Sequence, residues 1–260
     1  MLYNHSIPFY LLIGIMAIGV LQAGATGVLF FFKSSGIKRS NYFFGLLLIC
    51  FSLTLLHNIL ILCHFYEYYP RWKFLPIYFT LSFPVLLFFY VKLDLYPAYK
   101  LRWTDAKHFI LPVGQFLFLL INCLLPLQLK LQTDRFFYSI FYGAIEQALY
   151  LSLFFAYLYF ARRYIVQKRR DNRDPAQVRR LFYLRKLVKI LFILFVFHSV
   201  MVVSDFVAWE VFRRNMQSSK PYAALGVLSF TALVWWVGTY GFQVLLWGRR
   251  VFGRKRRVDG

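Results

Sequence analysis

Seven apolar segments alternate with short polar or basic stretches along the 260-residue chain. Apolar runs of about 20 residues are long enough, as helices, to cross a hydrocarbon layer about 30 Å thick. The segments cover residues 7–32, 42–64, 75–91, 109–129, 136–160, 175–209 and 223–246. The pattern therefore predicts an all-α polytopic membrane protein, with one seven-transmembrane-helix bundle over residues 1–247 and a short tail over residues 248–260.

The basic residues are distributed unevenly between the two sets of alternate connections. Of the 31 Lys and Arg, 23 lie in the connections that begin at residues 33, 92, 161 and 248, and seven lie in the opposite set. Short loops that carry an excess of Lys and Arg stay in the cytoplasm. We therefore expect the amino terminus outside, and the carboxyl terminus with its basic tail in the cytoplasm.

Composition excludes several other classes of protein. A chain that is 60% hydrophobic and only 16% charged has too few polar residues to cover a soluble domain. Its three cysteines, Cys50, Cys63 and Cys123, lie in apolar segments without metal-ligand spacing, and the loops contain no nucleophile triad or phosphate-binding glycine loop. The sequence thus predicts neither an enzyme nor a metal or cofactor site. The net charge of +21 comes largely from basic residues in the short loops, where they set the orientation of the helices in the membrane. We therefore do not expect direct binding to nucleic acid.

A strongly basic stretch joins the fifth and sixth apolar segments, with ten Lys or Arg between residues 161 and 186. Both flanking helices should continue past the membrane and form a basic helical hairpin. It has two interpretations: a patch that holds anionic lipid headgroups, or a surface that docks a partner and carries signal output. The residues concerned are Arg162, Arg163, Lys168, Arg169, Arg170, Arg179 and Arg180.

Ionisable residues lie inside the apolar segments, where an unpaired charge costs about 2.5 kcal/mol or more. Glu146 lies in the fifth segment, and His198 and Asp205 lie on one face of the sixth. At similar depth come His57 and Asn58 in the second segment, and Tyr142 and Tyr150 share the Glu146 face of the fifth. We expect either a ligand- or proton-sensing pocket built around a Glu146–His198 acid-base pair, or a buried polar network that locks helix packing.

The loop residues from Arg39 to Pro112 carry a family resemblance. The stretches RSNYFFGLLLICFSLTLLHNIL, YYPRWKFLPIYFTLSFPVLLFFYVK and YKLRWTDAKHFILP resemble the seven-helix membrane-sensor half of bacterial AraC-type transcription regulators. The resemblance implies a bacterial cytoplasmic (inner) membrane and a signal passed to a cytoplasmic DNA-binding domain. Only 14 residues follow Leu246, too few for two helix-turn-helix units, so we expect output through a separate partner.

These observations favour a membrane-embedded sensor or signal-relay component. The partners we expect are anionic lipids and a cytoplasmic or membrane protein, with a homo-oligomer as an open alternative. Two other functions stay open. A small-molecule or ion transporter or channel would use the same polar cluster as a path, and a non-catalytic accessory subunit would fill the pocket with its own side chains.

Overall fold

The computed structural model describes residues 7–33, 36–137, 142–171, 175–212, 216 and 219–255, and this part of the chain is helical, without a β-strand. Its α-helices are α1 (Ile7–Phe31), α2 (Lys38–Leu62), α3 (Phe65–Tyr68), α4 (Ser82–Leu95), α5 (Ile110–Leu124), α6 (Leu127–Phe137), α7 (Tyr142–Asp171), α8 (Pro175–Glu210) and α9 (Lys220–Lys255). Two 3₁₀ helices, η1 (Pro70–Trp72) and η2 (Trp103–Phe109), lie in the connections. The all-α prediction is confirmed.

Among the described residues, five helical segments, rather than the seven expected, are long and apolar enough to cross a membrane. They are Ile7–Phe31, Lys38–Leu62, Trp103–Leu124, Arg180–Ala208 and Pro221–Leu246. The expected third and fifth helices correspond to α4 and α7, which are not among the five. With 14 residues α4 spans only about 21 Å, and the apolar part of α7 contains Glu146 and Gln147 before the basic stretch begins. The chain is therefore a helical membrane protein by length and composition of its helices.

Prolines explain the main differences from the predicted helix boundaries. The third helix begins at Ser82 instead of residue 75. Proline is tolerated in the first turn of a helix, where Pro84 lies. In a helix that began at residue 75, the Pro84 ring would clash with the carbonyl of residue 80. Pro126 likewise separates α5 from α6, which we had expected to form one helix over residues 109–129. In contrast, Pro175 stands at the first helical position of α8, where its missing N–H costs nothing.

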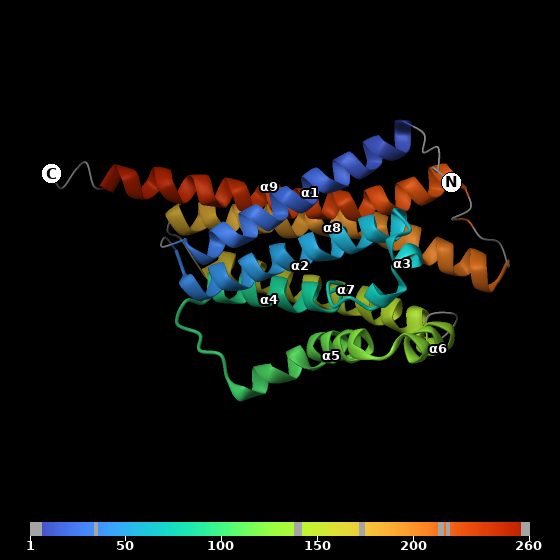
Figure 1. Ribbon diagram of the computed structural model, residues 1–260. Coiled ribbons are helices and arrows are strands. Elements are labelled where there is room, and N and C mark those ends of the chain that lie inside the picture. Colours follow the sequence, from blue (N-terminus) through green and yellow to red (C-terminus); the bar gives the residue numbers. More distant parts are fainter. Residues whose placement is uncertain are drawn as a thin grey trace.

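Six helices form a closed ring in the order α1, α2, α4, α7, α8 and α9, with α9 returning to α1 and also touching α2. Figure 1 shows them running side by side along the bundle, with α5 and α6 on one side of it. We call the end that contains Ile7, Leu62, Ser82 and Glu210 the pocket end, and the end that contains Lys38, Leu95, Asp171 and Pro175 the basic end (right and left in Figure 1).

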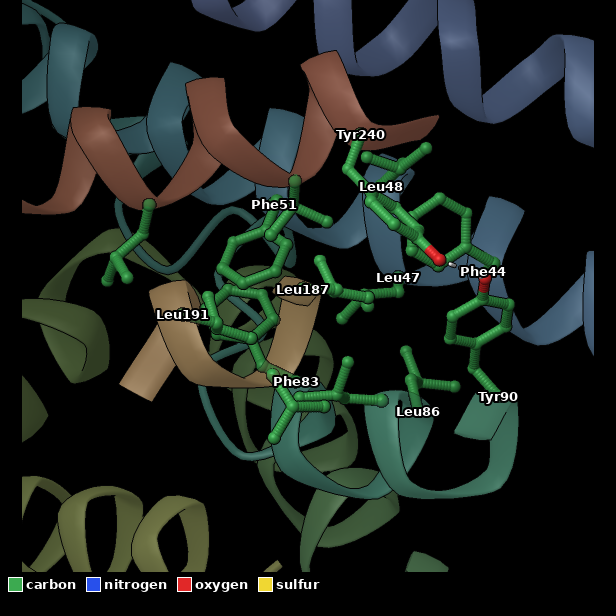
Figure 2. Close-up of a cluster of buried hydrophobic side chains, with 14 of the residues drawn as sticks. Phe44, Leu47, Leu48, Phe51, Phe83, Leu86, Tyr90, Leu187, Leu191 and Tyr240 are labelled. Atoms are coloured by element: carbon green, nitrogen blue, oxygen red, sulfur yellow. Dashed lines mark hydrogen bonds between the residues drawn. The ribbon is translucent and has the colours of Figure 1, made fainter. Parts of the chain in front are cut away.

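The core fills the middle of this ring with large side chains from α2, α4, α8 and α9 (Figure 2). The Phe51 ring of α2 stacks on the Phe83 ring of α4 with centroids 4.1 Å apart. Nearer the basic end, the hydroxyls of Tyr90 and Tyr240 meet at 3.4 Å between oxygens. Dense aromatic packing therefore closes the bundle between its two ends.

Close contact between α1 and α2 depends on two facing glycines. An added Cβ at Gly27 would lie 2.9 Å from the Gly45 carbonyl oxygen, and one at Gly45 would lie 2.9 Å from the Gly27 carbonyl oxygen. Both obstacles are backbone atoms, which cannot turn away as a side chain can. Small residues let membrane helices approach closely enough for backbone packing, and these two glycines serve that purpose.

We predict that Gly27→Ala will lower the free energy of unfolding by about 1–3 kcal/mol, the usual cost of overpacking a tight contact. Thermal unfolding of the purified protein in detergent measures it. Gly14→Ala on the same helix is the matched control, because a Cβ there meets no atom within 4 Å. Equal melting temperatures for the two variants would contradict the close α1–α2 contact.

Candidate functional site: a polar cavity at the pocket end

A cavity of about 300 Å³ opens between α2, α7, α8, α9 and the irregular segment that precedes α4. Every contributing helix supplies residues from its pocket-end part. The lining residues are Thr54, Asn58, Ile61, Leu62, Tyr78, Thr80, Gln147, Tyr150, His198, Met201, Val202, Asp205, Tyr222, Ala223, Gly226, Val227 and Phe230. Its volume is at the small end of the range for ligand pockets.

The cavity brings together four of the residues selected from the sequence: Asn58, Tyr150, His198 and Asp205. His198 and Asp205 share one face of α8 because they are seven residues apart, two turns of helix. Asn58 reaches the same space from α2 and Tyr150 from α7. These four residues of the predicted pocket therefore surround one space in the structure.

His198 is held in place by α9. Its Nδ1 lies 2.8 Å from Ser229 Oγ, and the Ser229 hydroxyl donates to the Gly226 carbonyl at 2.6 Å. Since the serine proton is used on Gly226, Ser229 must accept from the imidazole, so Nδ1 carries hydrogen. In the neutral ring Nε2 is then an acceptor. The Tyr150 and Phe230 rings lie beside the imidazole, with centroids 6.2 and 5.7 Å away.

Glu146 does not line the cavity and is not bonded to His198. It is buried behind Thr80, whose hydroxyl donates to its Oε1 at 3.1 Å, and Gln115 Nε2 of α5 donates to the same oxygen. Gln115 also donates to Thr80 Oγ1 at 2.9 Å and accepts from the Leu81 N–H at 3.1 Å. The expected acid-base pair is replaced by this network, because Glu146 faces α5 while His198 faces α9.

His57 also has a partner outside the cavity. Its Nδ1 lies 2.8 Å from the Tyr66 hydroxyl of α3, and its ring lies against Tyr78 with centroids 5.2 Å apart. Burial raises the pKa of Tyr66 to about 12, so that hydroxyl keeps its proton at neutral pH. His57 therefore packs α3 against α2. Tyr142 is the first residue of α7, but its side chain lies outside the described part of the structure.

Several polar residues that the sequence interpretation missed are central to the site. The sequence prediction considered ionisable groups and left out the neutral Thr80, Gln115 and Ser229. A buried amide or hydroxyl without a hydrogen bond also costs free energy, although less than an unpaired charge. Tyr222 of α9 also lines the cavity, and its hydroxyl donates to the Met201 carbonyl of α8 at 2.8 Å. A neutral polar residue inside an apolar segment is the sequence feature that indicates such positions.

The wall of the cavity contains one unsatisfied polar atom. Tyr150 is 5% exposed, and its hydroxyl has no hydrogen-bond partner among the residues that the structure describes. Buried hydroxyls almost always have a partner, so one without any needs an explanation. Beyond it, the packed rings of Phe51, Phe83 and Phe230 form a floor that separates the cavity from the basic end.

At the basic end, the residues predicted for lipid or partner contact fall into two groups. Arg162, Arg163, Arg169 and Arg170 are exposed on α7, whereas Lys168 is half-buried with its Nζ 5.1 Å from the Tyr96 ring centroid. Arg180 of α8 is also exposed, and it binds Asp94 of α4 through both guanidinium and carboxylate edges, with Nε to Oδ2 at 2.8 Å. The Arg179 side chain lies outside the described residues.

The Arg180–Asp94 pair fastens α8 to α4 at the basic end. The Asp94 side chain is 11% exposed and that of Arg180 46% exposed. A bidentate pair of this kind fixes orientation as well as distance. The two ends of α8 thus have different environments: a cavity wall at His198 and Asp205, and an ion pair at Arg180.

In the described ranges there is no group of three His, Cys, Asp or Glu side chains that could hold a metal ion. No family model, curated protein or solved structure matches the chain. Fold and site together define a helical membrane protein with a cavity of mixed polar and apolar lining at one end of its bundle.

We predict that Gln115→Leu will lower the free energy of unfolding by about 1–3 kcal/mol, because the buried Leu81 N–H loses its acceptor and Glu146 keeps only the bond from Thr80. Thermal unfolding in detergent measures the loss. Gln167→Leu is the matched control, because Gln167 is exposed on α7 and an exposed substitution should change stability by no more than about 0.5 kcal/mol. If both variants unfold alike, the network does not hold α5.

Proposed function

We propose that the protein is a membrane receptor module that senses a small ligand at the pocket end and relays its occupancy to the basic end. In this proposal all seven apolar segments span the membrane of a bacterial cell, with the amino terminus outside. The excess of Lys and Arg in one set of connections supports that orientation. The cavity would then face the exterior and the basic hairpin the cytoplasm.

The observation that carries the proposal is the continuity of α8. A single 36-residue helix, about 54 Å long, lines the cavity with His198 and Asp205 and forms the ion pair with Asp94 through Arg180. A ligand wedged between α8 and its neighbours would tilt or shift this helix. Because the helix is rigid along its length, the displacement would reach Arg180 and the exposed arginines of the hairpin.

A transporter has less support, since it needs a polar path through the bundle. The polar cavity is followed by the buried rings of Phe51, Phe83 and Phe230. An accessory subunit remains the competing function. In such a subunit the cavity would bind no ligand, and its occupancy would not change the rest of the bundle. The two predict different responses when the cavity is filled.

We predict that Gly226→Phe, which mimics occupancy, will change the distance between the cytoplasmic parts of α7 and α8. Gly226 lines the cavity, and an added Cβ there meets no atom within 4 Å, so the new ring has room to enter. Spin labels at Gln167 and Phe182, both exposed, report the distance by electron paramagnetic resonance in lipid nanodiscs after the native cysteines are replaced by serine. The mean distance should shift by about 1–2 Å.

Gly14→Phe is the control for this experiment. It places the same side chain at another glycine with open space around its Cβ, but outside the cavity lining. A relay requires the shift with Gly226→Phe and none with Gly14→Phe. Identical distance distributions in both variants and the parent would favour an accessory subunit instead.

A further inference from the structure

The part of the cavity around His198 is separate from the part around Asp205. Both residues lie on α8 and line the cavity, but the seven residues between these positions place them about 10 Å apart along the helix axis. Asp205 is the nearer of the two to the end of α8 at Glu210. The chemistry of the cavity around His198 therefore does not depend on the state of the carboxylate.

Hydrogen bonding decides which nitrogen of the His198 ring is open to a ligand. Nδ1 donates to Ser229 Oγ at 2.8 Å, so Nε2 carries no hydrogen in the neutral ring. Within the described chain, the polar side-chain atoms that are both fully buried and unbonded are the Tyr150 hydroxyl and Trp236 Nε1. Nε2 is not among them and its ring lines the cavity, so Nε2 is an acceptor that a molecule in the cavity can reach.

The surroundings of the imidazole favour its neutral form. The rings of Tyr150, Phe195 and Phe230 lie beside it, with centroids 6.2, 6.4 and 5.7 Å from its own. Its bond to α9 is made to Ser229, which is uncharged. Burying a charge in such an environment costs far more than burying a neutral ring. A ligand at this depth therefore meets a hydrogen-bond acceptor.

Tyr150 gives a second reason to expect a polar ligand atom at this depth. It lines the cavity, its ring meets the imidazole edge to face, and its hydroxyl has no hydrogen-bond partner among the described residues. Buried hydroxyls are nearly always bonded. A ligand hydroxyl that donates to Nε2 keeps two lone pairs, with which it can also accept a hydrogen bond. A hydroxyl group thus suits this wall better than a group that only donates or only accepts.

We propose that the cavity binds a small neutral hydroxyl compound, a phenol or an alcohol, whose hydroxyl donates to His198 Nε2. The apolar body of the ligand lies against Met201, Val227 and Phe230. A cavity of about 300 Å³ has room for a compact molecule of this kind. The proposal rests on the proposed function, in that the cavity is a ligand site, and it adds the chemical class of that ligand.

The experiment compares two hydroxyl compounds with their methyl ethers, which keep the oxygen and lose the donor. Para-cresol is paired with 4-methylanisole, and 2-phenylethanol with its methyl ether. Binding to the purified full chain in detergent is measured by calorimetry. At least one hydroxyl compound should bind about three- to tenfold more tightly than its ether, which is the effect of one hydrogen bond between neutral groups.

His198→Asn should lower this ratio of affinities by about the same factor of three to ten. The shorter amide can still donate to Ser229 in place of Nδ1, but it leaves no acceptor where Nε2 was. His198→Gln should retain the preference, because its longer side chain can place the amide oxygen near the position of Nε2. Comparing ratios between variants cancels the partition of each compound into detergent.

His64→Asn is the matched control. His64 is an exposed histidine at the pocket end, outside the cavity lining, so its replacement should leave the ratio unchanged. The melting temperature of each variant shows whether it is folded. If the asparagine variant of His198 is unfolded, the comparison of the parent with His198→Gln and with the two ethers still tests the proposal.

The outcomes separate this proposal from the receptor proposal. The same ratio in the parent and in His198→Asn would overturn the hydroxyl class, as expected if only water bonds to Nε2. Loss of all binding in Gly226→Phe would then still leave the cavity as a ligand site. No binding of any of the four compounds to the parent would also overturn the hydroxyl class. The receptor proposal is judged independently by the spin-label distances, which require no ligand.

Discussion

The structure depends on one constraint: polar groups inside an apolar bundle must find their partners within the chain. The clearest case is the irregular segment before α4, whose backbone lacks helical hydrogen bonds. Thr54 accepts from the Phe79 N–H at 3.0 Å, and Gln115 accepts from the Leu81 N–H. Side chains from α2 and α5 thus replace the missing helical bonds. The same Gln115 then bonds to Glu146, so one amide joins α5, α7 and the start of α4.

This constraint also bears on why the cavity with the polar lining residues lies at the pocket end. Towards the basic end, α2, α4 and α9 meet through aromatic rings, and Tyr90 and Tyr240 satisfy one another. Towards the pocket end, the nonhelical approach to α4 keeps Tyr78 and Thr80 at the wall, where a continuous helix would have placed a packed apolar ridge. Pro84, by fixing where α4 begins, is therefore an indirect cause of the open space.

Sequence patterns predicted the parts of this arrangement that depend on distance along a helix. Spacing of seven predicted His198 and Asp205 on one face of α8, and spacing of four predicted Tyr150 on the Glu146 face of α7. Counting from helix ends predicted Asn58 at a similar depth. Spacing along the chain does not predict how each helix is rotated about its own axis, and so which neighbouring helix a given face contacts. Glu146 and His198 lie on neighbouring helices at similar depth, yet one faces Gln115 and the other Ser229. Tertiary contacts decide that rotation, and apolar segments that are hydrophobic on all sides do not encode it.

Each end of α8 has a different kind of contact, and this difference matters for any relay. At the pocket end, Ser229 holds His198 through one neutral hydrogen bond, and the adjoining wall has space around it. At the basic end, Arg180 meets Asp94 through a bidentate ion pair that is partly solvated. A bidentate pair fixes orientation as well as distance, so a displacement of α8 would strain it. In the proposed relay, a shift of α8 at the pocket end would reach this pair because the helix between the two sites is continuous.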